Sequence, residues 1–77
     1  MSQHWTMELN NYCQKNRLTC TWAERQSGPL NAPTWTAFAY INGMEFGRGS
    51  SLKKTEAKEL AAETALRCLW QQQGYRV

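Results

Sequence analysis

The fold is decided by residues 46–69, FGRGSSLKKTEAKELAAETALRCL, which run from Phe46 to Leu69. A glycine-broken, serine-rich segment leads into a helix whose apolar residues recur one turn apart. These residues are Ala57, Ala61, Ala62, Ala65, Leu66 and Leu69. Lysines crowd the start of this helix, where unpaired N–H groups already carry partial positive charge. The arrangement is unfavourable for stability but suits the binding of an anion such as phosphate.

Upstream of this helix, the residue pattern predicts three strands. Cys20 and Trp22 alternate with polar neighbours, and two prolines with Gly28 mark a loop after them. The dipeptide Asn42-Gly43 predicts a tight hairpin. The expected strands are Thr19–Arg25, Trp35–Ile41 and the short Met44–Phe46, with loops over residues 26–34 and 47–51.

A second helix is expected near the N-terminus, from about Met7 to Asn16. Leu9, Tyr12 and Cys13 give it one apolar stripe, and Thr6 is its expected N-cap.

The later helix is expected to begin after Ser51 as its N-cap and to run to about Gln72, ahead of Gly74. The order α-β-β-β-α predicts an α+β two-layer sandwich with both helices on one face of a three-stranded antiparallel sheet. We expect one domain over residues 1–77, with its core at about 6–72.

Charge distribution points to an anionic partner. The 77-residue chain has a net charge of +3, and the segment from Arg48 to Lys58 alone carries four cations and one anion. A local basic patch is typical of proteins that bind nucleic acid or an acidic surface. No apolar run approaches the roughly 20 residues of a membrane span, and no signal-peptide pattern opens the chain. We therefore expect no membrane partner and a cytoplasmic or nuclear location.

Metal-ligating and nucleophilic residues are sparse. Cys13, Cys20 and Cys68 are irregularly spaced and His4 is the one histidine, which argues against a zinc site or a disulfide framework. We expect three small buried thiols, and Cys20 and Cys68 fall on presumed core faces. A stripe of three carboxylates on the later helix, which begins after Ser51, lacks companion ligands and is expected to face solvent; it consists of Glu56, Glu59 and Glu63. No cofactor, metal or catalytic residue is expected.

Four motifs together give the chain a resemblance to a known family. They are Leu9-x-x-Tyr12-x-Gln14-Lys15, Gly28-Pro29, Ile41-Asn42-Gly43-x-Glu45-Phe46-x-x-Gly49 and Ala57-Lys58-x-x-Ala61-Ala62-x-x-Ala65-Leu66-x-x-Leu69. In this order they resemble the double-stranded RNA-binding domain. The resemblance covers about Met7 to Leu69. The opening His4-Trp5-Thr6 also resembles the lead-in of such domains in nuclear DExH-type RNA helicases.

The resemblance implies a non-catalytic module, within a larger RNA-processing or RNA-sensing protein, that binds double-stranded RNA with little sequence preference. Such domains span about 16 base pairs and recognise A-form shape, 2′-OH groups and phosphates. Three contact regions carry over by position. They are Asn10, Asn11 and Gln14 on the first helix, Gly28, Pro29 and Asn31 in the first loop, and Lys53, Lys54 and Lys58 at the start of the last helix.

The chain departs from the family's pattern at two positions. Asn31 stands where the family commonly has histidine, so its reach into a second minor groove is shorter. One extra residue separates the lysine pair from Ala57, which places Thr55 where the second lysine of the family's motif normally lies.

The outer side of the sheet leaves an alternative open. Thr36, Phe38 and Tyr40 are predicted to face away from the helices. They would either lie beneath the terminal tails, through Trp5, Trp70 or Tyr75, or form a surface for another protein. The alternative function is therefore a domain of the same fold that mediates protein association or dimerisation, with weak or no RNA binding.

Overall fold

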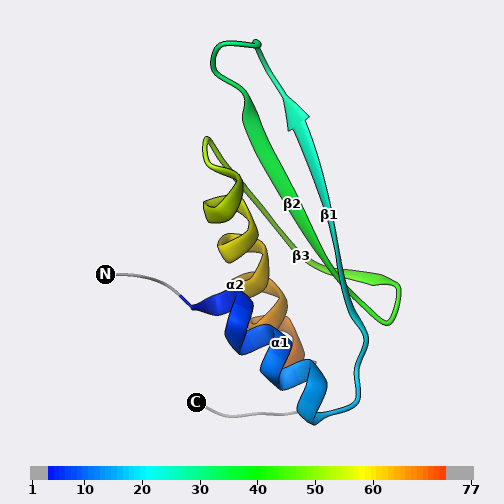
Figure 1. The fold of residues 1–77 in the computed structure, drawn as a ribbon. Coiled ribbons are helices and arrows are strands. Elements are labelled where there is room, and N and C mark those ends of the chain that lie inside the picture. The colour runs from blue at the N-terminus through cyan, green and yellow to red at the C-terminus, as the bar shows by residue number, and fades with distance from the viewer. Residues whose placement is uncertain (1–3, 73–77) are drawn as a thin grey trace.

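The computed structural model describes residues 4–72 and confirms the predicted α+β sandwich. Both helices lie on one side of a three-stranded antiparallel sheet in the order β1-β2-β3 (Figure 1). The elements are α1 (Trp5–Lys15), β1 (Cys20–Ser27), β2 (Thr34–Ile41), β3 (Met44–Ser51) and α2 (Lys54–Gln72). Gly74 and Tyr75 lie outside the described residues.

The hairpin between β2 and β3 has the predicted form. Asn42 and Gly43 both have positive φ, at 52° and 85°, as a two-residue turn between twisted strands requires. The side chain of Asn42 also accepts the Thr19 N–H at 2.9 Å, which attaches the hairpin to the chain before β1. The register shifts between Ala39 and Tyr40, and the extra residue on β3 is Phe46.

All three strands are longer than predicted, β2 by one residue, Thr34, at its start. β1 continues to Ser27, and the segment 47–51, expected to be a loop, completes β3. Gly47 pairs with Ala39 and Gly49 with Ala37, so both glycines belong to the strand. The prediction was wrong because glycine usually weakens a strand, whereas here it permits a close approach of another backbone.

That approach comes from α2. A Cβ atom on Gly47 would lie 2.4 Å from the carbonyl oxygen of Ala61, and one on Gly49 would lie 2.7 Å from that of Ala57. The alanine stripe of α2 therefore packs directly on the glycines of β3. Small residues on both elements set this short helix–sheet separation.

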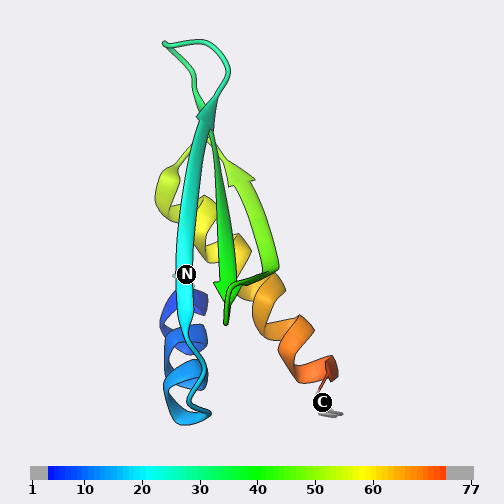
Figure 2. The same cartoon turned by 90° about the vertical axis from the view of Figure 1, so that its right-hand side faces the viewer.

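The core lies between the two layers. Its fully buried residues come from α1, β2 and α2; they are Leu9, Cys13, Ala37, Ala39, Ile41, Ala57, Ala61, Ala62, Ala65, Leu66 and Leu69. Trp22 and Trp35 pack against its margin. In Figure 2, the turn between β1 and β2 extends beyond both helices, so this end of the molecule consists of sheet alone.

A carboxylate of α2 caps the start of α1. Glu59 Oε1 accepts the N–H of Trp5 at 2.6 Å and that of Thr6 at 3.2 Å. Thr6 is thus inside the helix, and its predicted role as N-cap is wrong. The N-cap position belongs to His4, whose side chain makes no capping hydrogen bond.

The start of α2 is braced by Ser51. Its hydroxyl accepts the Lys53 N–H at 3.3 Å and donates to Glu56 Oε1 at 2.7 Å. Ser51 nevertheless lies on β3, and because α2 begins at Lys54 the cap position is Lys53, so the predicted role of Ser51 as the N-cap is wrong. The helix extends to Gln72, as predicted.

Candidate nucleic-acid interface

The polar face of α1 presents amides to solvent. Asn10, Asn11 and Gln14 are all exposed, because Leu9 and Cys13 turn the opposite face of the helix into the core. Asn11 and Gln14 line a shallow surface hollow with Lys15. An amide both donates to and accepts from a hydroxyl, so this surface has the chemistry to contact 2′-OH groups. Lys15, which belongs to the first-helix motif but was not among the expected contact residues, adds a cation to this surface.

The turn between β1 and β2 projects from the far end of the sheet. Gly28 has a φ of +89°, which favours glycine, and the Ala32 N–H donates to the Pro29 carbonyl at 3.1 Å to close the turn. Asn31 is exposed on this turn. Leu30, beside it, is 97% exposed, and sequence reasoning had not marked it. Gly28 and Pro29 thus shape the turn, and Asn31 is an exposed polar side chain on it.

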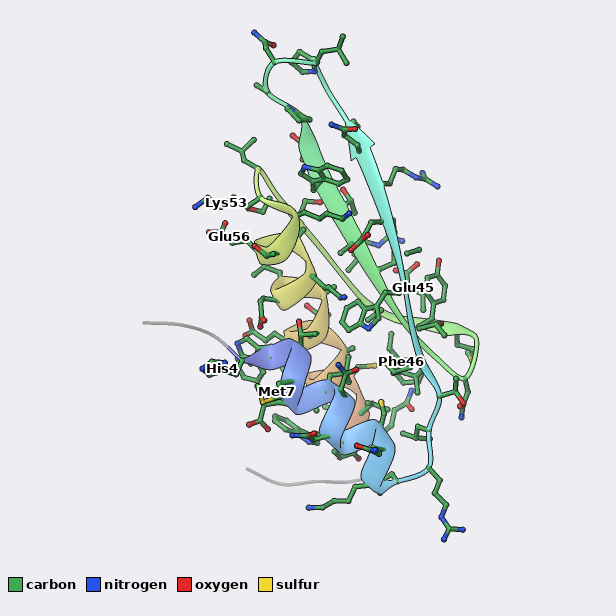
Figure 3. The ribbon with its side chains drawn as sticks, viewed as in Figure 1. His4, Met7, Glu45, Phe46, Lys53 and Glu56 are labelled. Atoms are coloured by element: carbon green, nitrogen blue, oxygen red, sulfur yellow. The ribbon has the colours of Figure 1, made fainter. Side chains whose placement is uncertain are left out.

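The lysines of the basic segment separate into two groups. Lys53 is exposed and points away from the sheet (Figure 3). Lys54 and Lys58, one helical turn apart, instead lie over aromatic side chains of the sheet. Lys54 Nζ is 5.1 Å from the ring centre of Trp35, and Lys58 Nζ is 4.9 Å from that of Trp22.

Lys54 also has an anionic neighbour. Its Nζ lies 3.4 Å from Glu24 Oε1 of β1, and its side chain remains 53% exposed. Sequence reasoning missed this pair because Glu24 and Lys54 are 30 positions apart. The ammonium of Lys54 is therefore shared between an aromatic ring and a carboxylate, and part of it still faces solvent.

The acidic residues of α2 do not form the solvent-facing stripe that the sequence predicted. Glu59 turns toward the start of α1, Glu56 bonds Ser51, and Glu63 pairs with Arg67 at 2.9 Å. The prediction was wrong for Glu59, whose carboxylate meets the unpaired N–H groups of another helix. Within residues 4–72, no three His, Cys, Asp or Glu side chains are grouped to hold a metal ion.

The three cysteines are free thiols. Cys13 is buried as expected, while Cys20 and Cys68 are half-buried. Burial raises the pKa of Cys13 to about 11, and burial also raises the pKa of Cys20. A thiol with a raised pKa stays protonated at neutral pH and is a poor nucleophile. This environment does not favour an enzyme that acts through Cys13 or Cys20.

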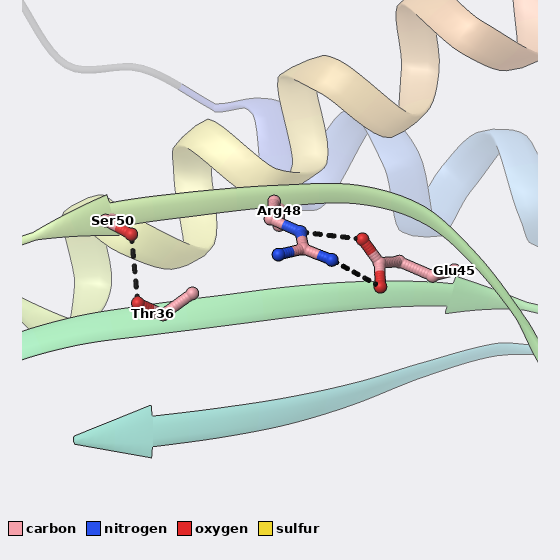
Figure 4. Close-up of polar contacts among 4 residues, drawn as sticks. All are labelled: Thr36, Glu45, Arg48 and Ser50. Atoms are coloured by element: carbon pink, nitrogen blue, oxygen red, sulfur yellow. Dashed lines mark hydrogen bonds and ion pairs between the residues drawn. The ribbon is translucent and has the colours of Figure 1, made fainter. Parts of the chain in front are cut away.

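The outer face of the sheet carries the aromatic residues as predicted. Phe38 lies between two arginines, with the Arg48 guanidinium 5.0 Å and the Arg25 guanidinium 5.9 Å from its ring centre. Arg48 also forms two hydrogen bonds with Glu45, at 2.8 and 3.1 Å, and Thr36 bonds Ser50 (Figure 4).

Neither described tail residue covers this outer face. Of the two alternatives left open for this face, cover by Trp5 or Trp70 is not observed, because both pack against the core cluster; Tyr75 lies outside the described residues. The side chains of Arg25 and Arg48 lie over the Phe38 ring instead, and a shallow hollow remains beside them. It is lined by Ala23, Glu24, Arg25, Phe38, Tyr40, Glu45 and Arg48.

The three predicted contact regions occupy different levels of one elongated molecule. The turn between β1 and β2 lies at one end, the start of α2 lies at mid-height, and α1 lies at the other end (Figures 1 and 2). The extents of the molecule are 42 × 30 × 18 Å. The regions therefore do not converge on a pocket, and this spacing suits a long, repetitive ligand.

A basic patch and spaced polar regions on a small domain are typical of nucleic-acid-binding modules. The sequence profile of the double-stranded RNA binding motif matches residues 5–69, and the chain belongs to this family. Domains of this family are non-catalytic binding domains.

Individual relatives agree with this assignment. The chain is 33% identical over 66 residues to ribonuclease 3 of Protochlamydia amoebophila, covering 83% of this chain and 27% of that protein. It is 34% identical over 58 residues to the RNA-binding protein OPG065 of monkeypox virus, covering 75% of this chain and 38% of that protein. The chain thus spans well under half the length of these relatives.

A solved structure shares the fold. The structure of Arabidopsis HYL1 superposes with a TM-score of 0.76 at 24% identity, covering 84% of this chain and 94% of that one. Within residues 4–72, no helix is both long and apolar enough to cross a membrane.

Proposed function

We propose that this chain binds double-stranded RNA through the A-form shape of the duplex, its 2′-OH groups and its phosphates, with little sequence preference. Family membership supports the ligand class. The deep, narrow major groove of A-form RNA excludes side chains, so contacts to the minor groove and to phosphates carry the recognition. This chain offers amides for the first kind of contact and lysines for the second.

The observation that carries the proposal is the order of the three regions along the molecule. α1 and the β1–β2 turn, which carry the amides, lie at opposite ends of the fold, and the start of α2, which carries the lysines in its sequence, lies between them (Figure 1). This order matches a duplex that presents a minor groove, a phosphate-lined major groove and a second minor groove in succession. Asn10, Asn11 and Gln14 would contact the first groove, Lys53, Lys54 and Lys58 the phosphates, and Asn31 the second groove.

We further propose that the chain acts without catalysis, as a module of a larger RNA-processing or RNA-sensing protein in the cytoplasm or nucleus. The small share of each relative that the chain covers supports a modular role. A DExH-type helicase is one candidate parent, on the basis of the His4-Trp5-Thr6 lead-in.

A titration with a 20-base-pair RNA duplex and with DNA of the same sequence and length tests the ligand class. We expect saturable binding to RNA and much weaker binding to DNA, which lacks the 2′-OH groups and the A-form grooves. With three to five phosphates contacted, the logarithm of the RNA affinity should fall with that of salt concentration at a slope of about −3 to −4.5. Equal affinity for both duplexes, or none for either, would contradict the proposal.

A second candidate role uses the outer sheet face. The hollow around Phe38 lies on the outer face of the sheet. Among residues 4–72, Arg25, which lines it, forms no ion pair with a carboxylate. An aromatic ring between two guanidinium groups suits a protein partner with acidic and apolar side chains. Binding of a partner that is lost in Phe38→Ser, with RNA affinity unchanged, would support this role.

A further inference from the structure

The lysines assigned to phosphate binding are held by the sheet rather than free in solvent. Lys58 Nζ lies 4.9 Å from the centre of the Trp22 ring, and Lys54 Nζ lies 5.1 Å from that of Trp35. Trp22 is on β1 and Trp35 on β2, and both side chains face the helix layer. The two lysines are one turn apart on α2, so their stems run in the same direction toward the sheet.

The strand register explains why these groups meet. Along β1, Trp22 and Glu24 are successive residues on the helix-facing side, paired with Ala39 and Ala37 of β2. Because both partners are alanine, the sheet leaves room beside them for long side chains from α2. Glu24 Oε1 reaches 3.4 Å from Lys54 Nζ in that space.

We propose that Trp22 and Trp35 are positioning residues for RNA binding and that Glu24 competes with RNA phosphate for Lys54. The inference rests on the proposed function, because it concerns how the same lysines meet a phosphate. The tryptophan faces orient the ammonium groups through cation–π attraction, which leaves their outer N–H donors available. A lysine stem that is already ordered loses less conformational entropy when it binds.

Glu24 acts in the opposite direction. A phosphate that binds Lys54 must displace the carboxylate or share the ammonium with it. The pair is more than half exposed on the lysine side, so its strength is that of a surface ion pair. An RNA phosphate can therefore displace the Glu24 carboxylate from Lys54. The cost of breaking this ion pair lowers the affinity for RNA by a modest factor. In the described part of the chain, Lys58 has no such carboxylate partner.

Substitution of Glu24 provides the first test, with a 20-base-pair RNA duplex as the probe. We expect Glu24→Gln to raise the affinity about two- to five-fold at low salt, the range of a surface ion pair. In a Lys54→Gln background, the same change should have no effect. The matched control is Glu45→Gln, which removes one carboxylate from the outer sheet face, where it pairs with Arg48. An equal rise in the Lys54→Gln background, or with Glu45→Gln, would show a general charge effect and overturn the inference.

Substitution of the aromatic rings provides the second test. Trp35→Leu keeps an apolar side chain at the core margin but removes the ring, whereas Trp35→Phe keeps a ring. We expect Trp35→Leu to weaken binding about two- to five-fold and Trp35→Phe to restore most of that loss. The proton shifts of the Lys54 side chain, measured without RNA, report the ring contact directly. Equal binding by the two variants, with both folded by circular dichroism, would refute the positioning role.

The two proposals fail in different ways. If the wild-type domain binds the duplex but Glu24→Gln and Trp35→Leu bind with wild-type affinity, this inference falls and the RNA-binding function stands. If the wild-type domain binds no RNA while its lysine proton shifts still report the ring contacts, the proposed function itself is wrong, and the inference falls with it.

Discussion

Glu59 on α2 caps α1: its Oε1 atom accepts the backbone N–H of Trp5 at 2.6 Å. The same oxygen accepts the N–H of Thr6 at 3.2 Å. Two of the N–H groups that every helix leaves unpaired at its start are thus satisfied by a side chain more than 50 positions away. The contact links the helix that carries the exposed amides to the helix that carries the lysines.

Glu59→Ala should therefore destabilise the domain. Loss of a helix cap costs about 1 kcal/mol, in a range of about 0.5–2 kcal/mol. Urea unfolding followed by tryptophan fluorescence measures the change, and hydrogen exchange should speed up at the Trp5 and Thr6 amides. Glu63→Ala is the control, because it breaks only an exposed pair with Arg67. A loss as large in the control would argue against a specific capping role.

Gly47→Ala should be severely destabilising. The new Cβ would lie 2.4 Å from the Ala61 carbonyl oxygen and 2.6 Å from the Ala65 nitrogen, and both are backbone atoms that a rotamer change cannot move. We expect a loss of about 3 kcal/mol or more in the free energy of unfolding, at the upper end for overpacked sites. Thermal denaturation by circular dichroism gives the measurement.

Gly43→Ala is the natural comparison. Its Cβ would meet nothing within 4 Å, and only its φ of +85° disfavours a side chain. The expected loss is about 1–2 kcal/mol. Similar losses at Gly43 and Gly47 would mean that α2 adjusts to the extra methyl group.

Lys54→Ala combined with Lys58→Ala should weaken binding to every RNA duplex by a similar factor, since phosphate contacts carry no sequence information. The slope of log affinity against log salt should become shallower by about 2. Arg67→Gln, which removes a cation from the opposite end of α2, should leave the slope unchanged. An unaltered slope in the double variant would remove these lysines from the interface.

Asn31→His should strengthen binding to long duplexes. The imidazole reaches further from the exposed turn than the amide does, so it can enter a second minor groove. A gain of one hydrogen bond corresponds to about two- to ten-fold in affinity. The gain in affinity should appear with a 20-base-pair duplex and vanish with a duplex of about 10 base pairs. The domain spans about 16 base pairs to reach a second minor groove, so the shorter duplex does not offer that groove. Equal gains on both lengths would place Asn31 outside that groove.

Cys13 should make the stability depend on alkaline pH. Burial raises the pKa of this thiol from 9.0 to about 11, so the folded state holds its proton more tightly than the unfolded state does. The protonated thiol contributes about 1–3 kcal/mol to the free energy of unfolding. This contribution is fully present below pH 9 and is lost as the pH rises toward 11. Unfolding in urea at pH 8, 9, 10 and 11 measures it. Cys13→Ala should show a shallower decline, and an identical decline would assign the effect to other groups.

Much of the architecture follows from local patterns. The alanine spacing of α2, the alternation in β2 and the Asn42-Gly43 turn each predict their own element, and together they predict the sandwich. The segment 47–51 was misassigned because Gly47 and Gly49 look like loop residues in isolation. Their role as strand residues depends on Ala57, Ala61 and Ala65 of α2, which no local window contains.

The candidate interface divides in the same way. The exposure of Asn10, Asn11 and Gln14 follows from helical periodicity, and that of Asn31 from its place in a turn. The environment of Lys54 could not be predicted, because Trp35 and Glu24 reach it only through the strand register and the packing of α2 on the sheet.

The sequence by itself determined the order of the elements, the hairpin turn, the small-residue stripe of α2 and the excess of positive charge at its start. These properties depend on residues within one or two turns of each other, where periodicity and backbone preference act directly. Tertiary structure alone decided that Glu59 caps α1, that glycines of β3 lie against α2 and that Lys54 and Lys58 rest on tryptophan rings. Those contacts join residues that are distant in the chain, so their partners are set only when the two layers pack together.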